Sequence, residues 1–462
     1  MQIIADLHIH SKFSRAVSPK MDLPEIASWA DKKGIQLMGT GDWTHPTWFQ
    51  HIKNTLEETT SGIYKIKGRN YNARFLLSVE ISSIYSHGGQ GRRIHNLIFS
   101  PSIATCEKIN FALQKRNCNL RSDGRPIIGL SSKELLEVIM EIDEKCLLIP
   151  AHIWTPWFAL FGSKSGFTSI KECFGNLDKY IYGVETGLSS DPIMNWQIAE
   201  LDNRSILSSS DAHSGPKIGR EATVFVPTMK QFNPLRQSSN EVNNLTISFT
   251  YQDIVDAIKQ NPNGKLKIGY TIEFFPEEGK YHWSGHRACN IKYTPDDVVK
   301  NGKTCPVCHQ TLTIGVENQI RDRSTRIITV DKLRLIKNSA GMTFVYDPEK
   351  KRRPFVSLVP LLEVLTEINE GSATKALEKY NRLVNIASEF DILLRKPCAE
   401  INTLGGEKLA QAIQIIRNRK VYINPGYDGV FGTVKIFNEP VDSNKTELTS
   451  VEEKQPTLFK LT

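Results

Sequence analysis

The 462-residue sequence predicts an α/β fold in which a barrel of strands carries polar side chains at one end. Strand and helix signals alternate from Met1 to about Phe275. The strand signals are short apolar runs bounded by Gly, Ser or Pro, which are typical of buried strands. A His, Asp or Glu ends many of these runs, and parallel barrels place their active-site residues there. The predicted barrel therefore carries a cluster of metal-ligand residues at its mouth.

Local signals support the helices and strands of this region. Asp22 can cap a helix whose first turn contains Pro24 and which Gly34 ends. Residues 229–246 are polar and rich in Asn, which predicts a loop or insertion. Residues 266–275 then predict a last strand that could close the barrel.

Residues of metal-ligand type recur at the ends of the apolar runs. In an extended strand, residues two apart share a face, so Asp6, His8 and His10 are expected to converge. A lone buried histidine is more often a hydrogen-bonded core residue than a ligand, but repetition at successive strand ends favours a metal centre. His and carboxylate ligands together suit two or more divalent metals, with imidazole favouring zinc or manganese. The full set is Asp6, His8, His10, Asp42, Glu80, His95, His152, Glu185, Asp211 and His213.

These motifs resemble the polymerase and histidinol phosphatase (PHP) superfamily over roughly residues 1–275. The resemblance rests on the DLHIHS segment, the Glu after an apolar run, the single His motifs and the late SDAH segment. It implies a distorted (β/α)7 barrel and a phosphoesterase site with two or three divalent metals (Zn, Mn or Mg). The implied ligands are His8, His10, Glu80 and Asp211 for one metal with Glu80 bridging, His95 and His152 for a second, and Asp42 and His213 for a third or just outside it.

The sequence departs from the three-metal pattern at two positions. Ala16 stands where some members of the superfamily have a histidine, and Trp43 follows Asp42 where many have one. His45 could substitute for the second of these, so two metals are expected and a third stays open. The candidate catalytic residues are Glu80 as the bridge, Asp211, and His213 or Asp42 as a proton carrier.

The composition changes at Pro276, and residues 276–320 predict a small zinc-binding module. A C-x2-C pair with a His and a Cys upstream has the spacing of a structural zinc site. His282 or His309 could replace the upstream His286. The predicted ligands are His286, Cys289, Cys305 and Cys308.

Residues 321–437 are predicted to form a helical, basic, DNA-binding domain. A run of charges is usually a solvated face, but beside a phosphoesterase-like barrel it also suits contact with phosphates. The clustered cations are Lys350, Lys351, Arg352 and Arg353. Residues 438–462 predict a flexible tail. In this tail Gln455, Leu458 and Phe459 resemble the short peptide that docks onto the bacterial sliding clamp, although a frayed end is the simpler reading.

Charge and composition narrow the class of protein. The net charge of +8 and the pI near 8.9 indicate an anionic partner, with nucleic acid the leading choice. Four of the eight cysteines are dispersed through the barrel and are expected to be free thiols in a reducing, cytoplasmic compartment. The sequence contains no run of 18 apolar residues, so no membrane span is expected.

The order of these parts resembles the endonuclease Q family over nearly the whole chain. In that family a PHP-type barrel is followed by a zinc-binding insertion and a helical domain, as at Cys289, Cys305 and Cys308 here. The resemblance implies incision of damaged single- or double-stranded DNA. The cut would fall on the 5′ side of a deaminated base (uracil, hypoxanthine or xanthine) or an abasic site, leaving a 3′-hydroxyl and a 5′-phosphate.

Such an enzyme must expose the damaged nucleotide to its active site. Trp43, Trp154 and Trp157 each follow a candidate ligand and are candidates for stacking on a flipped base, but packing at the barrel rim explains them equally well. Arg92 and Arg93 precede another ligand and are candidates for DNA contact.

Two other functions stay open from the sequence. A small-molecule phosphatase of the histidinol-phosphate type would need neither the zinc module nor the basic region. A non-catalytic DNA-binding scaffold would not need a complete ligand set. Release of phosphate from a small ester would favour the first, and full activity without Asp211 would favour the second.

Overall fold

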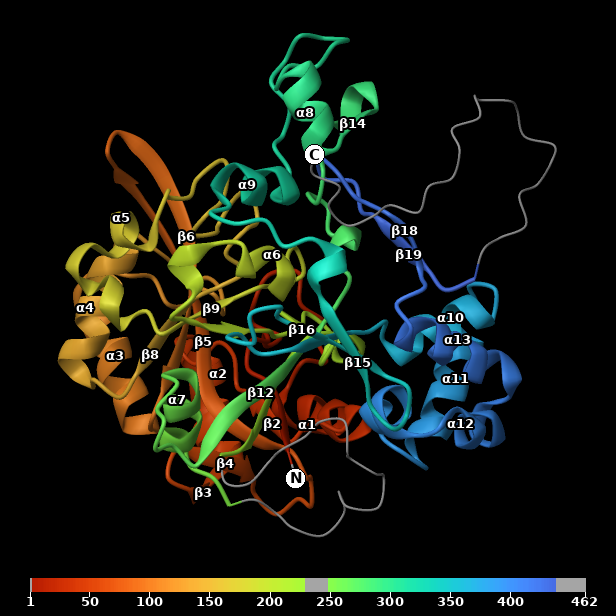
Figure 1. The fold of residues 1–462 in the computed structure, drawn as a ribbon. Coiled ribbons are helices and arrows are strands. Elements are labelled where there is room, and N and C mark those ends of the chain that lie inside the picture. The colour runs from red at the N-terminus through yellow and green to blue at the C-terminus, as the bar shows by residue number, and fades with distance from the viewer. Residues whose placement is uncertain (1, 229–247, 438–462) are drawn as a thin grey trace.

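One large mixed sheet, built mainly from the N-terminal part of the chain, organises the fold (Figure 1). The structure is a computed structural model that describes residues 2–228 and 248–437. The barrel strands are β1 (Ile3–Asp6), β2 (Leu37–Gly39), β3 (Leu56–Thr60), β4 (Ile63–Ile66), β5 (Arg74–His87), β6 (Gln90–Ser100), β7 (Ile127–Ile128), β8 (Leu147–Pro150), β9 (Gly183–Glu185), β10 (Ser205–Leu207), β11 (Ala222–Pro227) and β12 (Leu266–Glu273).

The directions of neighbouring strands make the barrel irregular. β1, β2 and β5 are parallel, whereas β11 runs antiparallel to both β1 and β12. β5 returns through a long hairpin as β6, and β8 pairs with the far side of β6. β9 and β10 form a separate parallel pair that contacts β8. The predicted α/β class with a distorted barrel is confirmed.

The helices of this region begin and end where local chemistry predicts. The carboxylate of Asp22 accepts a hydrogen bond from the N–H of Glu25 at 3.1 Å and so caps the first helix. Gly34 ends that helix with a φ of 83°, and a Cβ there would lie 2.4 Å from Ser388 Oγ. The helices are α1 (Leu23–Lys33), α2 (Pro46–Thr55), α3 (Ile103–Lys115), α4 (Ser132–Ile142), α5 (Ile170–Phe174), α6 (Pro192–Trp196) and α7 (Tyr251–Ile258).

Residues 334–357 differ from the prediction of a helical domain. They form the strands β15 (Arg334–Lys337), β16 (Thr343–Tyr346) and β17 (Phe355–Ser357). β17 pairs in parallel with β12, so these strands extend the barrel sheet. The helical prediction is wrong here because short segments such as Thr-Phe-Val-Tyr of β16 favour strands, and β17 gains burial on the edge of β12.

The rest of the C-terminal region is helical, as predicted. Its elements are α10 (Leu361–Ile368), α11 (Ala373–Val384), a π-helical turn (Asp391–Arg395), α12 (Cys398–Gly405) and α13 (Glu407–Arg417). None of the helices within residues 2–228 and 248–437 is long and apolar enough to cross a membrane. The predicted loop 229–246 and the clamp-peptide residues Gln455, Leu458 and Phe459 lie outside the described residues.

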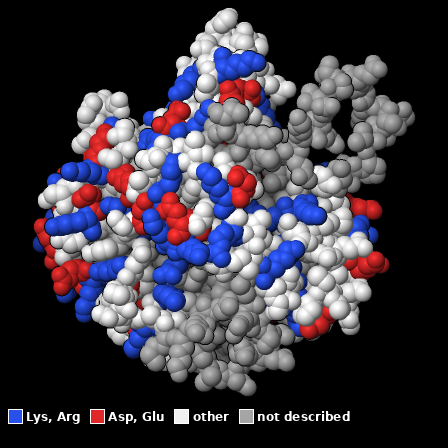
Figure 2. All heavy atoms as spheres, in the orientation of Figure 1, with Lys and Arg blue, Asp and Glu red and all other residues white. Residues whose placement is uncertain are grey.

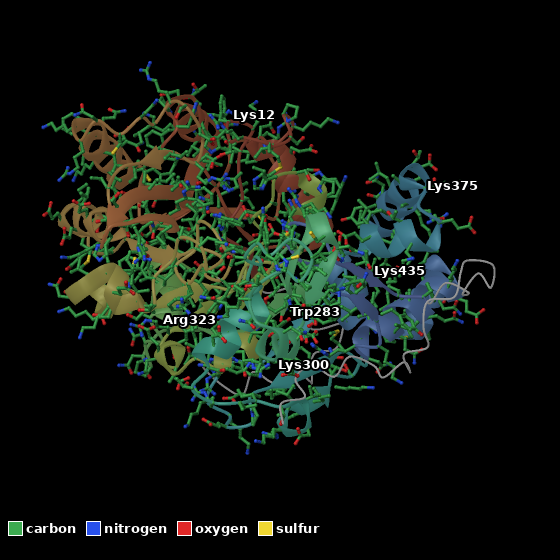
Figure 3. All side chains as sticks on the ribbon, turned by 90° about the horizontal axis from the view of Figure 1, so that it is seen from above. Lys12, Trp283, Lys300, Arg323, Lys375 and Lys435 are labelled. Carbon is green, nitrogen blue, oxygen red and sulfur yellow. The ribbon has the colours of Figure 1, made fainter. Side chains whose placement is uncertain are left out.

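A small module projects from the barrel at the top of Figure 1 and consists of β13 (Ser284–His286), β14 (Ile291–Tyr293), α8 (Pro295–Asn301) and α9 (Val316–Arg323). The hairpin of β18 (Tyr422–Asn424) and β19 (Thr433–Lys435) returns to it from the helical unit. There the N–H of Trp283 donates to the carbonyl of Gly426 at 2.9 Å. From above, Lys12 of the barrel, Lys300 of the module and Lys375 of the helical unit lie on three different sides (Figure 3).

A buried ion pair joins the barrel to the helical unit. Lys33, the last residue of α1, is fully buried, and its Nζ lies 2.9 Å from Glu389 Oε2. The same carboxylate accepts from the hydroxyl of Tyr380 at 2.8 Å and from the N–H of Leu361 at 2.9 Å. Both charged groups are buried away from water, so each is stabilised by the opposite charge of the other.

Replacing Lys33 by methionine should lower the free energy of unfolding by about 3–5 kcal/mol, because Glu389 then stays buried without its counter-charge. The double variant Lys33→Met, Glu389→Gln should recover part of this loss, since no buried charge is left unpaired. Denaturant unfolding measures both, with the exposed Lys20→Met as the control. A loss below about 1 kcal/mol, typical of surface pairs, would contradict this account.

Candidate metal centre and substrate cavity

Two groups of ligand atoms lie side by side at the mouth of the barrel. The ligand atoms within each group lie within 4.8 Å of one another. They come from the segment after β1, the hairpin of β5 and β6, and the segments after β8 and β10. His8, His10 and Asp211 form one group, and Glu80, His95 and His152 form the other.

Glu80 joins the two groups through its two carboxylate oxygens. Oε1 lies 2.6 Å from His95 Nδ1 and 3.0 Å from His152 Nε2. Oε2 lies 3.3 Å from His10 Nε2 and 3.6 Å from His8 Nε2. A carboxylate that faces two ligand sets has the geometry of a bridge between two metals.

The ligand atoms of the first group lack hydrogen-bond partners among the described residues. His8 Nε2, His10 Nε2 and Asp211 Oδ1 are all buried and unpartnered. Buried polar atoms normally have a hydrogen-bond partner. Three unpartnered atoms that point to one place are therefore consistent with a bound cation. Imidazole nitrogens with carboxylate oxygens suit zinc, manganese or a related divalent metal.

Carboxylates behind two of the histidines fix the orientation of their rings. Glu185 lies 3.0 Å from His8 Nδ1, and Asp42 lies 3.1 Å from His10 Nδ1. The hydroxyl of Ser11 donates to Asp42 at 2.6 Å. The Nε2 atoms of both rings therefore face the ligand groups, and such carboxylate–histidine pairs hold metal ligands in place. Asp42, predicted as a ligand or catalytic group, supports His10 instead.

Two further residues of the sequence-derived set lie outside the ligand groups. Asp6 accepts from the N–H and hydroxyl of Ser210 and from the N–H of Gly219, so it ties β1 to the loop after β10. His213 packs edge-on against His10 with ring centroids 4.8 Å apart. His45 caps α2, where its ring accepts from the N–H of the third helical residue. Within the described residues, these side chains assemble no third ligand group.

Three residues of the site have unusual backbone conformations. Asp42, His152 and Asp211 have φ values of 52°, 31° and 48°. Such conformations cost about 1–3 kcal/mol each and persist only where the surroundings impose them. Gly187 helps to impose one, because a Cβ at this glycine would lie 2.4 Å from His152 Cβ. Position 187 therefore needs glycine, because its backbone packs closely against His152.

The electrostatics of the centre favour a bound cation. Burial raises the pKa of Glu80, but His95, Arg125 and His8 outweigh burial and hold that pKa well below its usual range. Burial lowers the pKa of His95 to about 4, and the nearby Glu80 opposes this shift. Burial also acts to lower the pKa of His8, but Glu185 and Glu80 together raise it well above the usual value.

A cavity of about 780 Å³ opens beside the ligand groups. Its wall includes the arginines Arg15, Arg93 and Arg125 and the aromatic residues Trp157, Phe158 and Tyr281. Arg125 Nη1 donates to Glu80 Oε2 at 3.0 Å. Sequence reasoning missed Arg125 and Tyr281, because neither belongs to a motif and both reach the site only through folding.

Of the three predicted stacking tryptophans, only Trp157 reaches the cavity. Trp43 is fully buried, and Trp154 is buried with its indole N–H donating to Asn195 at 2.8 Å. Trp157 is half-buried and packs edge-on against Tyr281 with centroids 5.5 Å apart. Stacking on a flipped base therefore stays a prediction for Trp157 alone.

The two arginines before His95 face different ways. Arg92 points inward, where its guanidinium donates to the carbonyl of Gly166 and lies 3.4 Å from Glu172. Arg93 lines the cavity instead. Only Arg93 is therefore placed to contact DNA at the metal centre.

The basic run 350–353 lies far from the metal centre. These residues precede β17, which is parallel to β12, so they stand at the end of the barrel where its strands begin. The guanidinium of Arg352 is bound to Asp202 and Asp347 at 2.6 and 3.1 Å. Contact of this run with DNA stays a prediction, and its position would place that contact away from the metal centre.

Two solved structures are similar to this chain over nearly its whole length. A lesion-specific endonuclease Q from Pyrococcus furiosus matches with a TM-score of 0.75 and 28% identity, covering 97% of this chain and all of that chain. Endonuclease Q in complex with a 27-mer duplex carrying an abasic lesion at the active site matches with a TM-score of 0.76, 28% identity, and coverage of 96% and 100%. The chain is similar to endonuclease Q over nearly its whole length.

Two sequence relatives of this chain are uncharacterised proteins. An uncharacterised protein of Bacillus subtilis is 27% identical over 94% of this chain and 99% of its own length. An uncharacterised protein of Methanocaldococcus jannaschii is 28% identical over 64% of this chain, and the aligned part spans about a third (33%) of that relative. No protein-family model matches the sequence.

The projecting module brings together a second kind of candidate metal site. The ligand atoms of the module lie within 4.8 Å of one another, and His286 Nδ1 lies 3.3 Å from Cys308 Sγ. Neither His282 nor His309 joins the group. The set that folding brings together is His286, Cys289, Cys305 and Cys308, which suits one tetrahedral zinc.

Replacing Asp42 by asparagine should weaken metal binding at the barrel by about ten- to hundredfold, because His10 loses the carboxylate that orients it. Titration with manganese or zinc against a competing chelator measures this. Asp123→Asn, a cavity carboxylate outside the ligand groups, is the matched control, and zinc in the Cys module is an internal reference. A loss as complete as that of Asp211→Asn would place Asp42 among the ligands.

Proposed function

We propose that the protein is a metal-dependent endonuclease that cuts DNA at damaged nucleotides. The observation that carries the proposal is Glu80, whose carboxylate stands between two ligand groups. Three residues of these groups, His95, His152 and Asp211, line the cavity. The likeness to endonuclease Q over nearly the whole chain supports DNA as the substrate.

The ligand groups supply the donor set for phosphodiester hydrolysis. Two divalent metals (Zn, Mn or Mg) in these groups would activate a bridging water and stabilise the attacking and leaving oxygens. The chain itself fixes the donors, since Glu185 and Asp42 aim the Nε2 atoms of His8 and His10. Such preorganised charge is effective because no reorganisation is needed during the reaction.

Arginines of the cavity are placed to hold the DNA backbone. Arg125 lies against Glu80, and Arg15 is 80% exposed with a single ion pair to Asp123 at 3.5 Å. Arg93 lies over Phe158 on the cavity wall. We propose that these cations bind the scissile and flanking phosphates.

His213 is a candidate for proton transfer. Burial lowers its pKa, so the ring is neutral near pH 7, and its side chain is about one-third exposed (33%). It lies next to His10 but outside the ligand groups. A neutral imidazole at the edge of a metal centre can accept or deliver a proton.

The cavity has room for one extruded nucleotide. Trp157 and Tyr281 line it together with the candidate ligands His95, His152 and Asp211. Extruding a nucleotide costs least where pairing is already lost or weak, which favours a damaged site. We propose that the lesion enters this cavity.

The finer chemistry is also a proposal. We propose incision on the 5′ side of uracil, hypoxanthine, xanthine or an abasic site, leaving a 3′-hydroxyl and a 5′-phosphate. We propose that the chain consists of four parts: a barrel (1–275), a zinc module (276–320), a DNA-binding region (321–437) and a clamp-binding tail (438–462). The family resemblance and the four-ligand site of the module support this assignment.

The test incubates the protein with DNA duplexes that each carry one uracil, hypoxanthine or abasic site. The reactions contain manganese, magnesium or a chelator, and the DNA ends that form are mapped. Cutting should require metal. Asp211→Asn should slow it by at least about a thousandfold, because a metal ligand worth several kcal/mol is lost. The exposed Asp331→Asn is the control. No cutting of any lesion would refute the proposal, and phosphate release from small esters alone would favour a phosphatase.

Trp157→Ala should weaken binding of lesion-containing DNA by about ten- to hundredfold, the usual loss for one base–aromatic contact. Binding of undamaged duplex should change little, because its bases stay stacked in the helix. Fluorescence anisotropy in calcium or chelator measures both without cutting. Phe111→Ala, which removes an exposed aromatic residue from α3, is the matched control. Equal losses on damaged and undamaged DNA would place Trp157 on the backbone instead.

A further inference from the structure

An exposed aromatic side chain stands in the loop 425–432, which joins β18 to β19 beside the zinc module. Phe431 is 65% exposed, more than any other Phe, Tyr or Trp within residues 2–228 and 248–437. The preceding Val430 is exposed as well. Single exposed apolar residues are common on protein surfaces, so the surroundings of this pair decide whether it has a role.

Backbone contacts hold the loop 425–432 in one conformation. The N–H groups of Gly426, Gly429 and Gly432 donate to three carbonyls of the segment 277–280 at 2.8, 2.9 and 3.0 Å. A Cβ at Gly432 would collide with one of these carbonyl oxygens, so only glycine allows the two backbones to lie so close. The loop is thus ordered before any partner binds, which lowers the entropic cost of binding.

The segment beneath the loop leads directly into the wall of the cavity at the metal centre. Tyr281 lines that cavity, and a Cβ at Gly429 would lie 3.8 Å from its hydroxyl oxygen. Lys280, the neighbour of Tyr281 in the chain, has its Nζ 4.5 Å from the ring centre of Phe431. The Cα atoms of Gly429 and Phe431 can be at most about 7 Å apart, which is about two base steps of DNA. The exposed ring therefore lies at the edge of the cavity.

Positive charge accompanies this ring. Besides Lys280, the guanidinium of Arg287 lies against the loop, 3.2 Å from where a Cβ of Gly429 would be. Asp428, the one carboxylate of the loop, accepts from the backbone N–H of Arg287 at 2.7 Å. Figure 2 shows further Lys and Arg side chains on the projecting module and on the surface below it. An apolar ring beside cations matches the stacked bases and the phosphates of DNA.

We propose that Phe431 enters the base stack next to the lesion and fills the gap that the extruded nucleotide leaves. Apolar side chains inserted between base steps hold DNA in such a distorted form, and any base can stack on an aromatic ring. The proposal rests on the proposed function, because it requires the damaged nucleotide to enter the cavity lined by Tyr281. Phe431 has a positioning role and takes no part in the chemistry of the cut.

Fluorescence anisotropy of the full-length protein in calcium, with duplexes that carry one uracil, one abasic site or no lesion, tests this role. Phe431→Ala should weaken binding of both damaged duplexes by about ten- to hundredfold, the usual loss for one base–aromatic contact. The two losses should be alike, because the ring stacks on a neighbouring base and not on the lesion. Binding of the undamaged duplex should change little. Phe431→Tyr should bind like the parent, because it keeps the aromatic ring.

Controls separate this role from folding and from the proposed function. Phe431→Ala should melt like the parent, since the ring is mostly exposed, and Phe111→Ala should leave DNA binding unchanged. Lesion preference kept in Phe431→Ala would overturn the role of Phe431 but not the proposed function, and so would a loss in Phe431→Tyr as large as in Phe431→Ala. A parent that binds damaged and undamaged duplexes alike would overturn both. Self-association lost in Phe431→Ala, with DNA binding kept, would make the ring a contact between two copies instead.

Discussion

The shared burial of Glu80 between two sets of histidines is the interaction on which the rest of the site depends. One oxygen of its carboxylate faces His95 and His152, and the other faces His8 and His10. A buried carboxylate needs compensating charge, and here that charge comes from imidazoles, from Arg125 and from any metal that the ligand groups bind. The long hairpin of β5 and β6 makes this possible, because it carries Glu80 and His95 on adjacent strands.

Supporting carboxylates determine which ring nitrogens of the histidines face the ligand groups. Glu185 and Asp42 occupy the Nδ1 sides of His8 and His10, so the Nε2 sides point to the centre. The strained backbone at Asp42, His152 and Asp211 shows that packing imposes this geometry. The same packing leaves Trp157 and the arginines of the cavity exposed beside the ligands. Candidate metal ligands, the three arginines and Trp157 thus line one cavity.

The two ends of the barrel carry different chemistry. Strand ends bear the ligands, whereas the basic run 350–353 stands where the strands begin. The three added strands β15, β16 and β17 bring that run to the barrel, since β17 covers the edge of β12. The helical unit docks through the buried pair of Lys33 and Glu389, and the hairpin of β18 and β19 reaches back to the zinc module. One chain thereby holds three kinds of charged site around a single sheet.

The sequence by itself determined the α/β class, the caps of α1 and the six residues of the two ligand groups. The cap depends on a local rule, and alternation along a strand places His8 and His10 on one face, whereas the resemblance to the PHP superfamily implied the other four ligands. Only the tertiary structure decided which carboxylates reach the centre, so Asp42 and Asp6 became supports. It also decided that Trp43 and Trp154 are buried, that Arg352 is paired, and that Arg125 joins Glu80. The physical reason is that these distances join residues far apart in the chain, which no local pattern can encode.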